Sequence, residues 1–122
     1  MDLYREEILD HFKNPRNFGV VKKTKLRAKE TNASCGDVME MSLRIKKGKV
    51  EEIRFQAEGC AISIAAGSML TEMVKGEKVA EVKGLGEEEM MKRLGIKVSS
   101  GRRKCATLGL VVCQKAIRKV RK

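Results

Sequence analysis

A cysteine and an aspartate lie close together in the segment N-A-S-C-G-D, which runs from Asn32 to Asp37. The sulfur of Cys35 is a soft metal ligand, whereas the carboxylate of Asp37 is a hard one. The pair therefore suggests a metal site with mixed ligands, and Gly36 between them lets the backbone come close to a metal. Asp37 also suits a simple turn before a strand, which is compatible with a ligand role.

Three more cysteines follow at wide intervals, at positions 60, 105 and 113. No C-x-x-C pair is present, so the local ligand pairs of zinc ribbons, zinc fingers and ferredoxin-type sites are not supported. Because these residues are far apart in the sequence, only the tertiary fold could bring Cys35, Cys60 and Cys105 together. Because no apolar leader is seen after Met1, we expect reduced thiols, with disulfide pairing as the alternative. Any single cysteine could also be a small buried hydrophobic residue.

The elements that must position these cysteines begin with a helix and an antiparallel hairpin. Leu3, Ile8 and Phe12 lie on one side of a predicted helix that ends at Lys13 or Asn14, just before a proline. A charged segment from 26 to 31 follows as an edge strand. Alternating apolar residues then predict two paired strands around the turn K-K-G-K; these residues are Met39, Met41, Leu43, Ile45, Ile53, Phe55 and Ala57.

The second half of the chain is predicted to be mainly helical. Ser63 is expected to cap a helix that stops near Gly76, a short turn lies around 79–82, and a further helix runs from about Glu87 to Leu94. The segment 99–101 is expected to be a flexible loop before a long last helix, whose buried residues are Leu108, Val112, Ala116 and Val120. The predicted fold class is α+β, with a small antiparallel sheet of about three strands packed on one face by helices, in one domain over residues 1–122.

Three of the four cysteines fall at the ends of these predicted elements. Cys35 precedes the hairpin, Cys60 precedes a helix, and Cys105 falls in the first turn of the last helix, beside the three cations of 102–104. Backbone N–H groups, helix dipoles and nearby cations favour the thiolate, which is the form that binds metal. Cys113 lies about 12 Å further along the same helix, in an apolar run, and is expected to be part of the core.

The formal net charge of the chain is +11, and the segment Gly101 to Lys122 holds eight lysines or arginines and no acid. This concentration indicates either an acidic partner or a solvated helix face. Three Phe, one Tyr and no Trp disfavour nucleic-acid binding, because few rings are present to stack on bases. No apolar stretch reaches the roughly 20 residues of a membrane span, so we expect a soluble cytoplasmic protein.

Several motifs in a fixed order make the chain resemble the IscU/SufU/NifU N-terminal-like family of iron–sulfur cluster assembly scaffolds. The matching segments are Y-R-E-E-I-L-D-H-F-K-N-P-R-N-F-G from Tyr4, A-S-C-G-D from Ala33, E-G-C-A-I-S from Glu58, S-M-L-T-E from Ser68 and R-K-C-A-T-L from Arg103. The resemblance implies that Cys35, Cys60 and Cys105 are the cluster cysteines and that Asp37 is the associated carboxylate. The lone histidine, His11, is interpreted as structural.

The resemblance also implies a function as an assembly scaffold rather than an enzyme. Such a scaffold docks a pyridoxal-phosphate-dependent cysteine desulfurase, accepts persulfide sulfur, and combines it with iron and electrons into a two-iron, two-sulfur cluster for apo-acceptor proteins. We expect Cys105 to be the first sulfur acceptor and Cys35 the second, because the attacking thiol must be ionised and accessible. A carboxylate from Asp37 would keep the cluster displaceable. A homo-oligomer in the cluster-bound state is a further expectation.

Two departures from the family pattern keep an alternative open. IscU-type members have a histidine where this chain has Lys104, as in SufU-like proteins, and a protonated lysine cannot bind iron. The short spacing from Cys60 to Cys105 instead resembles the IscU type, and the Leu-Pro-Pro-Val-Lys chaperone segment is absent. The alternative is a SufU-like sulfur relay in which the three cysteines and Asp37 hold zinc. An RNA-binding module is a third and more distant hypothesis.

Overall fold

The computed structural model describes residues 3–33 and 36–120 of the chain. Within these ranges a three-stranded sheet and five helices follow one another in the order helix, three strands, four helices. Their bounds are α1 (Leu3–Lys13), β1 (Arg27–Asn32), β2 (Asp37–Lys46), β3 (Lys49–Glu58), α2 (Ala61–Val74), α3 (Val79–Lys83), α4 (Glu87–Leu94) and α5 (Ser100–Ile117). This architecture confirms the predicted α+β fold. No helix within the described ranges has the length and apolar character needed to cross a membrane.

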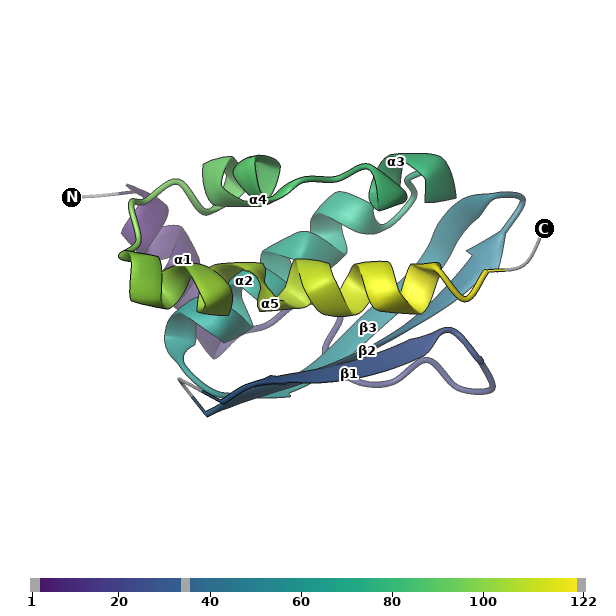
Figure 1. Cartoon of the computed structure of the whole chain (residues 1–122), viewed down its shortest axis with the longest axis horizontal. Helices are drawn as coiled ribbons and strands as arrows, with labels where there is room; N and C mark the ends of the chain where they lie inside the picture. Colours follow the sequence, from purple (N-terminus) through teal and green to yellow (C-terminus); the bar gives the residue numbers. More distant parts are fainter. Residues whose placement is uncertain (1–2, 34–35, 121–122) are drawn as a thin grey trace.

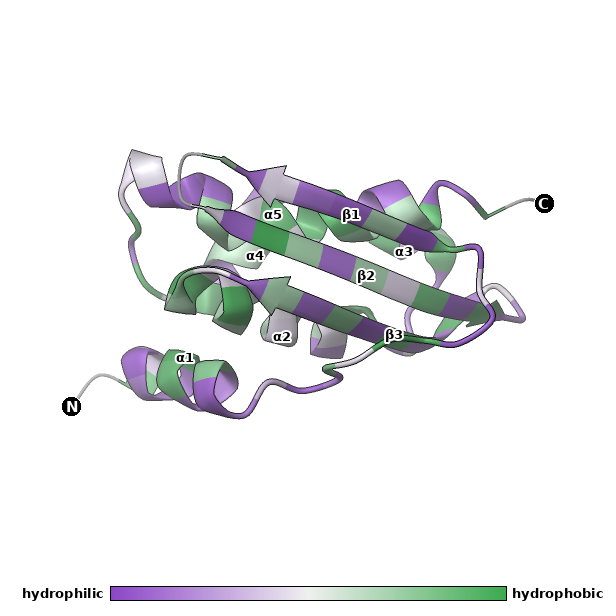
Figure 2. Ribbon diagram, turned by 90° about the horizontal axis from the view of Figure 1, so that it is seen from below, coloured by the Kyte–Doolittle hydropathy of each residue, from purple (hydrophilic) through white to green (hydrophobic). Residues whose placement is uncertain are grey.

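The sheet is antiparallel throughout, with the strand order β1-β2-β3. Strands β2 and β3 pair from Val38 opposite Glu58 to Lys46 opposite Lys49. The two residues between them, Lys47 and Gly48, both have positive φ, at 53° and 76°, as the tight hairpin turn requires. The helices lie on one side of the sheet (Figure 1), and the view from below shows the strands in front of α3, α4 and α5, with α1 beyond the edge of the sheet next to β3 (Figure 2).

The core lies between the sheet and helices α2 and α5. The inward side chains of β2 and β3 are fully buried: Met39, Met41, Leu43, Ile53 and Phe55. Two glycines let the helices approach each other and the sheet. A Cβ on Gly67 of α2 would lie 2.8 Å from the Met39 side chain, and one on Gly109 of α5 would lie 3.3 Å from the Gly67 Cα. This close crossing fixes where the start of each helix lies relative to the sheet.

The first helix ends at Lys13, as predicted, but its buried side differs from the apolar pattern. Of the three apolar residues on the predicted side, only Ile8 is buried, while Leu3 and Phe12 are 76% and 38% exposed. His11 is the other buried residue of α1, and its Nδ1 lies 2.7 Å from the Ser68 Oγ of α2. This polar contact turns the helix so that Phe12 faces outward.

The starts of α2 and α5 also differ from the predictions. Cys60, not Ser63, occupies the N-cap of α2, and Ser63 lies buried within the helix. Helix α5 has Ser99 as its N-cap and begins at Ser100, so the expected loop at 99–101 is wrong. Serine is common both in loops and at N-caps, and here the Ser99 carbonyl accepts the first helical hydrogen bonds. Cys105 therefore lies in the second turn of α5 rather than the first.

Candidate metal centre

Asp37, Cys60 and Cys105 come together at one end of the molecule, although they are far apart in the sequence. One carboxylate oxygen and the two cysteine sulfurs lie within 4.8 Å of one another. They come from the start of β2, the N-cap of α2 and the second turn of α5, and these three segments meet at the same end of the sheet in Figure 1. Two sulfurs bound to one tetrahedral zinc ion are about 3.8 Å apart, so atoms within 4.8 Å of one another have nearly the spacing that a shared metal ion requires.

Cys35, the fourth predicted ligand, lies outside the described residues, so its place relative to the other three stays a prediction. Asp37 lies two residues further along the chain and is the first residue of β2. The ligand roles of all four residues likewise remain predictions, because the geometry shows only that three of them converge.

The Asp37 carboxylate is buried in an arrangement that leaves one oxygen free for a ligand. Its Oδ1 accepts a hydrogen bond from the backbone N–H of Cys60 at 2.9 Å. Its Oδ2 is also buried and has no hydrogen-bond partner among the described residues. Burying an unpaired carboxylate oxygen is costly unless a cation or donor compensates. A metal ion held together with the two sulfurs would supply that compensation, so the donor set fits iron or zinc.

Gly59 allows the Asp37 carboxylate to lie against the turn between β3 and α2. Its φ is 150°, and a Cβ at this position would lie 2.1 Å from Asp37 Oδ1. No side chain can occupy that space without moving the carboxylate. This glycine has no predicted role, and the one feature of the sequence that points to it is its position directly before Cys60.

Cys105 is fully buried, which contradicts the expectation that its thiol is accessible. Its sulfur accepts a hydrogen bond from the Asn32 side chain, with an N···S distance of 3.7 Å. The nearby charge also differs from the prediction. Arg103 forms ion pairs with Glu88 and Glu87 of α4, at 2.8 and 3.3 Å, so its positive charge is partly neutralised.

The contacts of Cys113 and His11 indicate structural roles. Cys113 is part of the core, as predicted, and burial raises the pKa of its thiol to about 12, so it stays protonated at neutral pH. His11 is buried between Ser68 and Glu72 of α2, and its Nε2 lies 3.5 Å from a Glu72 oxygen. Burial, with Arg16 as a smaller cause, lowers the pKa of His11. Its contacts join α1 to α2.

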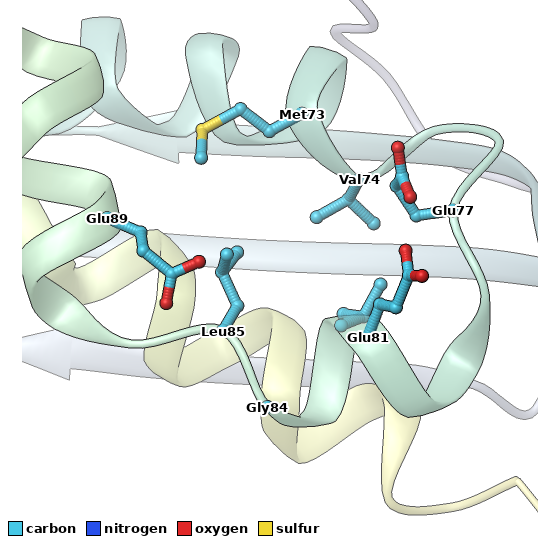
Figure 3. Close-up of a pocket in the computed structure, with 8 residues that line it drawn as sticks. Met73, Val74, Glu77, Glu81, Gly84, Leu85 and Glu89 are labelled. Atoms are coloured by element: carbon cyan, nitrogen blue, oxygen red, sulfur yellow. The ribbon is translucent and has the colours of Figure 1, made fainter.

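A pocket of about 510 Å³ lies elsewhere on the molecule, where α2 ends and α3 and α4 follow (Figure 3). Its apolar wall includes Met73 and Leu85, and the Glu77 and Glu81 carboxylates point toward each other at its edge. The side-chain hydrogen bond to Glu81 raises the pKa of Glu77. Asp37, Cys60 and Cys105 do not line this pocket, so the site that these three residues form is a separate feature.

Comparison with known proteins identifies relatives along almost the whole chain. The family model described as "NifU-like N terminal domain" matches residues 3–122. The iron–sulfur cluster assembly scaffold protein IscU 1 of Archaeoglobus fulgidus is 37% identical over 93 residues, which cover 76% of this chain. The chain spans 61% of the length of that relative. The IscU scaffold protein of Aquifex aeolicus is 36% identical over 117 residues, covering 94% of this chain and 74% of the relative.

The match to a relative with a different name covers a similar share of this chain. The zinc-dependent sulfurtransferase SufU of Bacillus subtilis is 32% identical over 136 residues, covering 96% of this chain and 90% of SufU. Among solved structures, the N-terminal part of a nitrogen-fixing NifU-like protein from Brucella abortus superposes with a TM-score of 0.78. That match covers 95% of this chain and 92% of the other at 19% identity, so it concerns the fold alone. The chain belongs to the NifU-like N-terminal domain family, together with IscU- and SufU-type proteins of iron–sulfur cluster assembly.

Proposed function

We propose that this protein is a scaffold on which a two-iron, two-sulfur cluster is assembled and from which it is passed to apo-acceptor proteins. The observation that carries the proposal is the convergence of the Asp37 carboxylate with the Cys60 and Cys105 sulfurs, with one buried carboxylate oxygen left unpaired among the described residues. Cys35 completes the proposed ligand set. The cluster is cargo here, and the protein's part is to collect, hold and release it.

Sulfur enters, in this proposal, from the persulfide of a cysteine desulfurase. A cysteine thiolate of the scaffold attacks the outer sulfur, the S–S bond breaks, and the desulfurase cysteine leaves as a thiolate. Two electrons from an external donor then reduce the transferred sulfur to sulfide, which bridges the iron ions. Because the Cys105 thiol is buried in this conformation, the proposal gives first acceptance to Cys35 and the later role to Cys105.

Release of the cluster depends on Asp37. A carboxylate holds iron less firmly than a thiolate, so its bond is the first to yield to an incoming acceptor thiolate. When the Asp37 oxygen leaves iron, the carboxylate keeps its hydrogen bond from the Cys60 N–H. That retained partner lowers the cost of leaving the carboxylate buried without a metal. The same contact therefore supports both the loaded and the empty site.

The proposed partners are a pyridoxal-phosphate-dependent cysteine desulfurase, donors of iron and electrons, and apo-acceptor proteins. The relatives named as IscU scaffolds support this set. The proposed place of action is the cytoplasm, and a homo-oligomer is proposed for the cluster-bound state.

A zinc-dependent sulfur relay is the second candidate function, supported by the SufU relative, by Lys104 and by the enclosed position of Cys105. One observation favours the scaffold. The SufU alignment extends over 136 residues, more than the 122 of this chain, so SufU contains at least 14 residues that this chain lacks. The alignment with the Aquifex scaffold needs only 117. This agrees with a short, IscU-like spacing between the second and third cysteines.

Anaerobic reconstitution tests the proposal directly. Metal-free protein is supplied with ferrous iron and sulfide, and the expected result is a visible sulfur-to-iron charge-transfer spectrum with two irons per bound cluster. Cys60→Ser should abolish that spectrum. A wild-type protein that forms no such chromophore, but whose zinc form stimulates sulfur release by a desulfurase, would reject the scaffold and support the relay.

A further inference from the structure

We propose that Asn32 is a positioning residue of the metal centre, whose side-chain amide holds the Cys105 sulfur by a hydrogen bond and weakens it as an electron donor. The inference rests on the proposed metal-binding function and extends it to a residue that is not itself a ligand. Asn32 is the last residue of β1 and is 8% exposed. Its Nδ2 lies 3.7 Å from the Cys105 Sγ, although 73 residues separate the two in the chain.

The burial of Asn32 needs a reason, because asparagine is a poor choice for this place. Asparagine is depleted in strands, where β-branched and aromatic residues fit better. A buried amide also costs free energy unless its donors are used. The amide of Asn32 donates a hydrogen bond to the sulfur of a predicted ligand. An apolar residue of the same size would fill the space without that interaction.

The position of Asn32 in the sheet links it to the rest of the centre. In the ladder between β1 and β2, Asn32 is paired directly with Asp37. The segment between them, 33–36, contains the Cys35 position. The two residues that flank this segment are thus each hydrogen-bonded to a different cysteine: Asn32 to the sulfur of Cys105, and Asp37 to the backbone N–H of Cys60. The two hydrogen bonds join the strand pair to α5 and α2, the two helices that carry the other sulfurs.

A hydrogen bond to a metal-bound thiolate has an electronic effect as well as a geometric one. It withdraws electron density from the sulfur, so the sulfur donates less to the metal, and in iron–sulfur proteins such bonds are among the features that set the reduction potential. Loss of the Asn32 donor should therefore make the cluster harder to reduce. It should also raise the energy of the sulfur lone pairs and move thiolate-to-metal charge-transfer bands to longer wavelength.

Cobalt(II) binding to the metal-free full-length protein provides the test, because its thiolate charge-transfer band reports directly on the sulfur. Asn32→Leu removes the amide at nearly constant size, and Asn32→Asp removes the donor at constant shape. Asn17→Asp is the matched control, since the Asn17 side chain donates at 3.0 Å to an oxygen, Thr71 Oγ1, and not to a predicted ligand. We expect both Asn32 variants to shift the band to longer wavelength and the Asn17 variant to leave it unchanged.

A purely structural role for Asn32 gives a different result, namely a lower melting temperature of the metal-free protein with an unchanged band position. That outcome overturns the inference, and so does a wild-type protein with no thiolate-to-cobalt band. Failure of the proposed function is recognised separately. If the wild type shows the cobalt band and the Asn32 shift but forms no cluster from iron and sulfide, the scaffold proposal fails while the role of Asn32 stands.

Discussion

Cys105 and Cys113 lie on the same helix, and both are fully buried, but their neighbours differ in kind. Cys105 has the Asn32 amide, the Asp37 carboxylate and the Cys60 sulfur around it. Cys113 is part of the apolar core, and burial alone accounts for the raised pKa of its thiol. Burial therefore does not separate the proposed ligand Cys105 from the core residue Cys113. The polar groups that the fold brings to the sulfur make the difference.

Serine substitution at the two cysteines should give the largest contrast. Cys105→Ser removes a proposed ligand, and we expect no stable iron–sulfur chromophore after anaerobic reconstitution, because a neutral hydroxyl is a poor replacement for a thiolate. Cys113→Ser should keep the chromophore and lose some stability, since a hydroxyl is buried in an apolar site. Circular dichroism of both metal-free variants checks that they fold. Loss of the chromophore in a folded Cys113 variant would contradict the assignment of the site.

Much of this contrast could be predicted from the sequence, but by two different routes. The position of Cys113 in an apolar run of a helix was sufficient to place it in the core. The alternation along β2 and β3 likewise predicted the hairpin, because a strand with one buried face has a period of two residues. The meeting of Cys60 with Cys105 was not available from spacing, since it depends on how α2 and α5 cross. It came from the family resemblance.

The predictions that failed concern contacts between distant side chains. The apolar pattern of α1 could not reveal that His11 and Ser68 would meet across 57 residues and turn Phe12 outward. The composition of 99–101 is typical of a loop and does not reveal the start of a helix, because serine and glycine are common in loops and at helix N-termini alike. Gly59 was missed for a similar reason, since its role depends on the place of the Asp37 carboxylate in space.

Alkaline unfolding should reveal the apolar surroundings of Cys113. Burial raises the pKa of the Cys113 thiol from its ordinary value of 9.0 to about 12 in the folded protein, so below pH 9 the thiol is protonated in both the folded and the unfolded state. Between pH 9 and 12 the Cys113 thiol ionises only in the unfolded chain. This single group should therefore lower the free energy of unfolding by up to about 1.4 kcal/mol per pH unit. Urea titrations of wild type and Cys113→Ala should show the steeper decline in the wild type. Parallel declines would indicate that the thiol ionises without unfolding.

Substitution of Asp37 tests whether the carboxylate near Cys105 controls release of the cluster. Asp37→Cys would replace the weak oxygen ligand by a fourth thiolate, so we expect slower cluster handover to an apo-ferredoxin, by about tenfold or more. The rate is followed by the appearance of the ferredoxin spectrum. If the variant hands over its cluster as fast as the wild type, the carboxylate does not control release.

Gly59 offers a smaller perturbation of the same carboxylate. In Gly59→Ala the new Cβ would overlap Asp37 Oδ1, and the φ of 150° is unfavourable for alanine, so we expect a loss of about 1–3 kcal/mol in unfolding free energy. Metal affinity should fall as the carboxylate moves. Gly101→Ala is the control, since its Cβ would meet no atom within 4 Å. Equal metal affinity in the two variants would show that the site tolerates displacement of Asp37.

The charges around the start of α5 should give the smallest effect, on binding of the desulfurase. Arg103, and Lys115 in the last turn of the same helix, already have acidic partners within the chain, whereas Lys104 is exposed and directly precedes Cys105. Lys104→Glu should therefore weaken desulfurase binding several-fold at low salt, and the difference should shrink as salt is added. Lys83→Glu on α3 changes the net charge equally but lies on a different element. Calorimetric titrations that show the same loss for both variants would indicate long-range attraction by the net charge, whereas a loss confined to Lys104 would place the partner near the start of α5, at the end of the helix that carries Cys105 rather than Cys113.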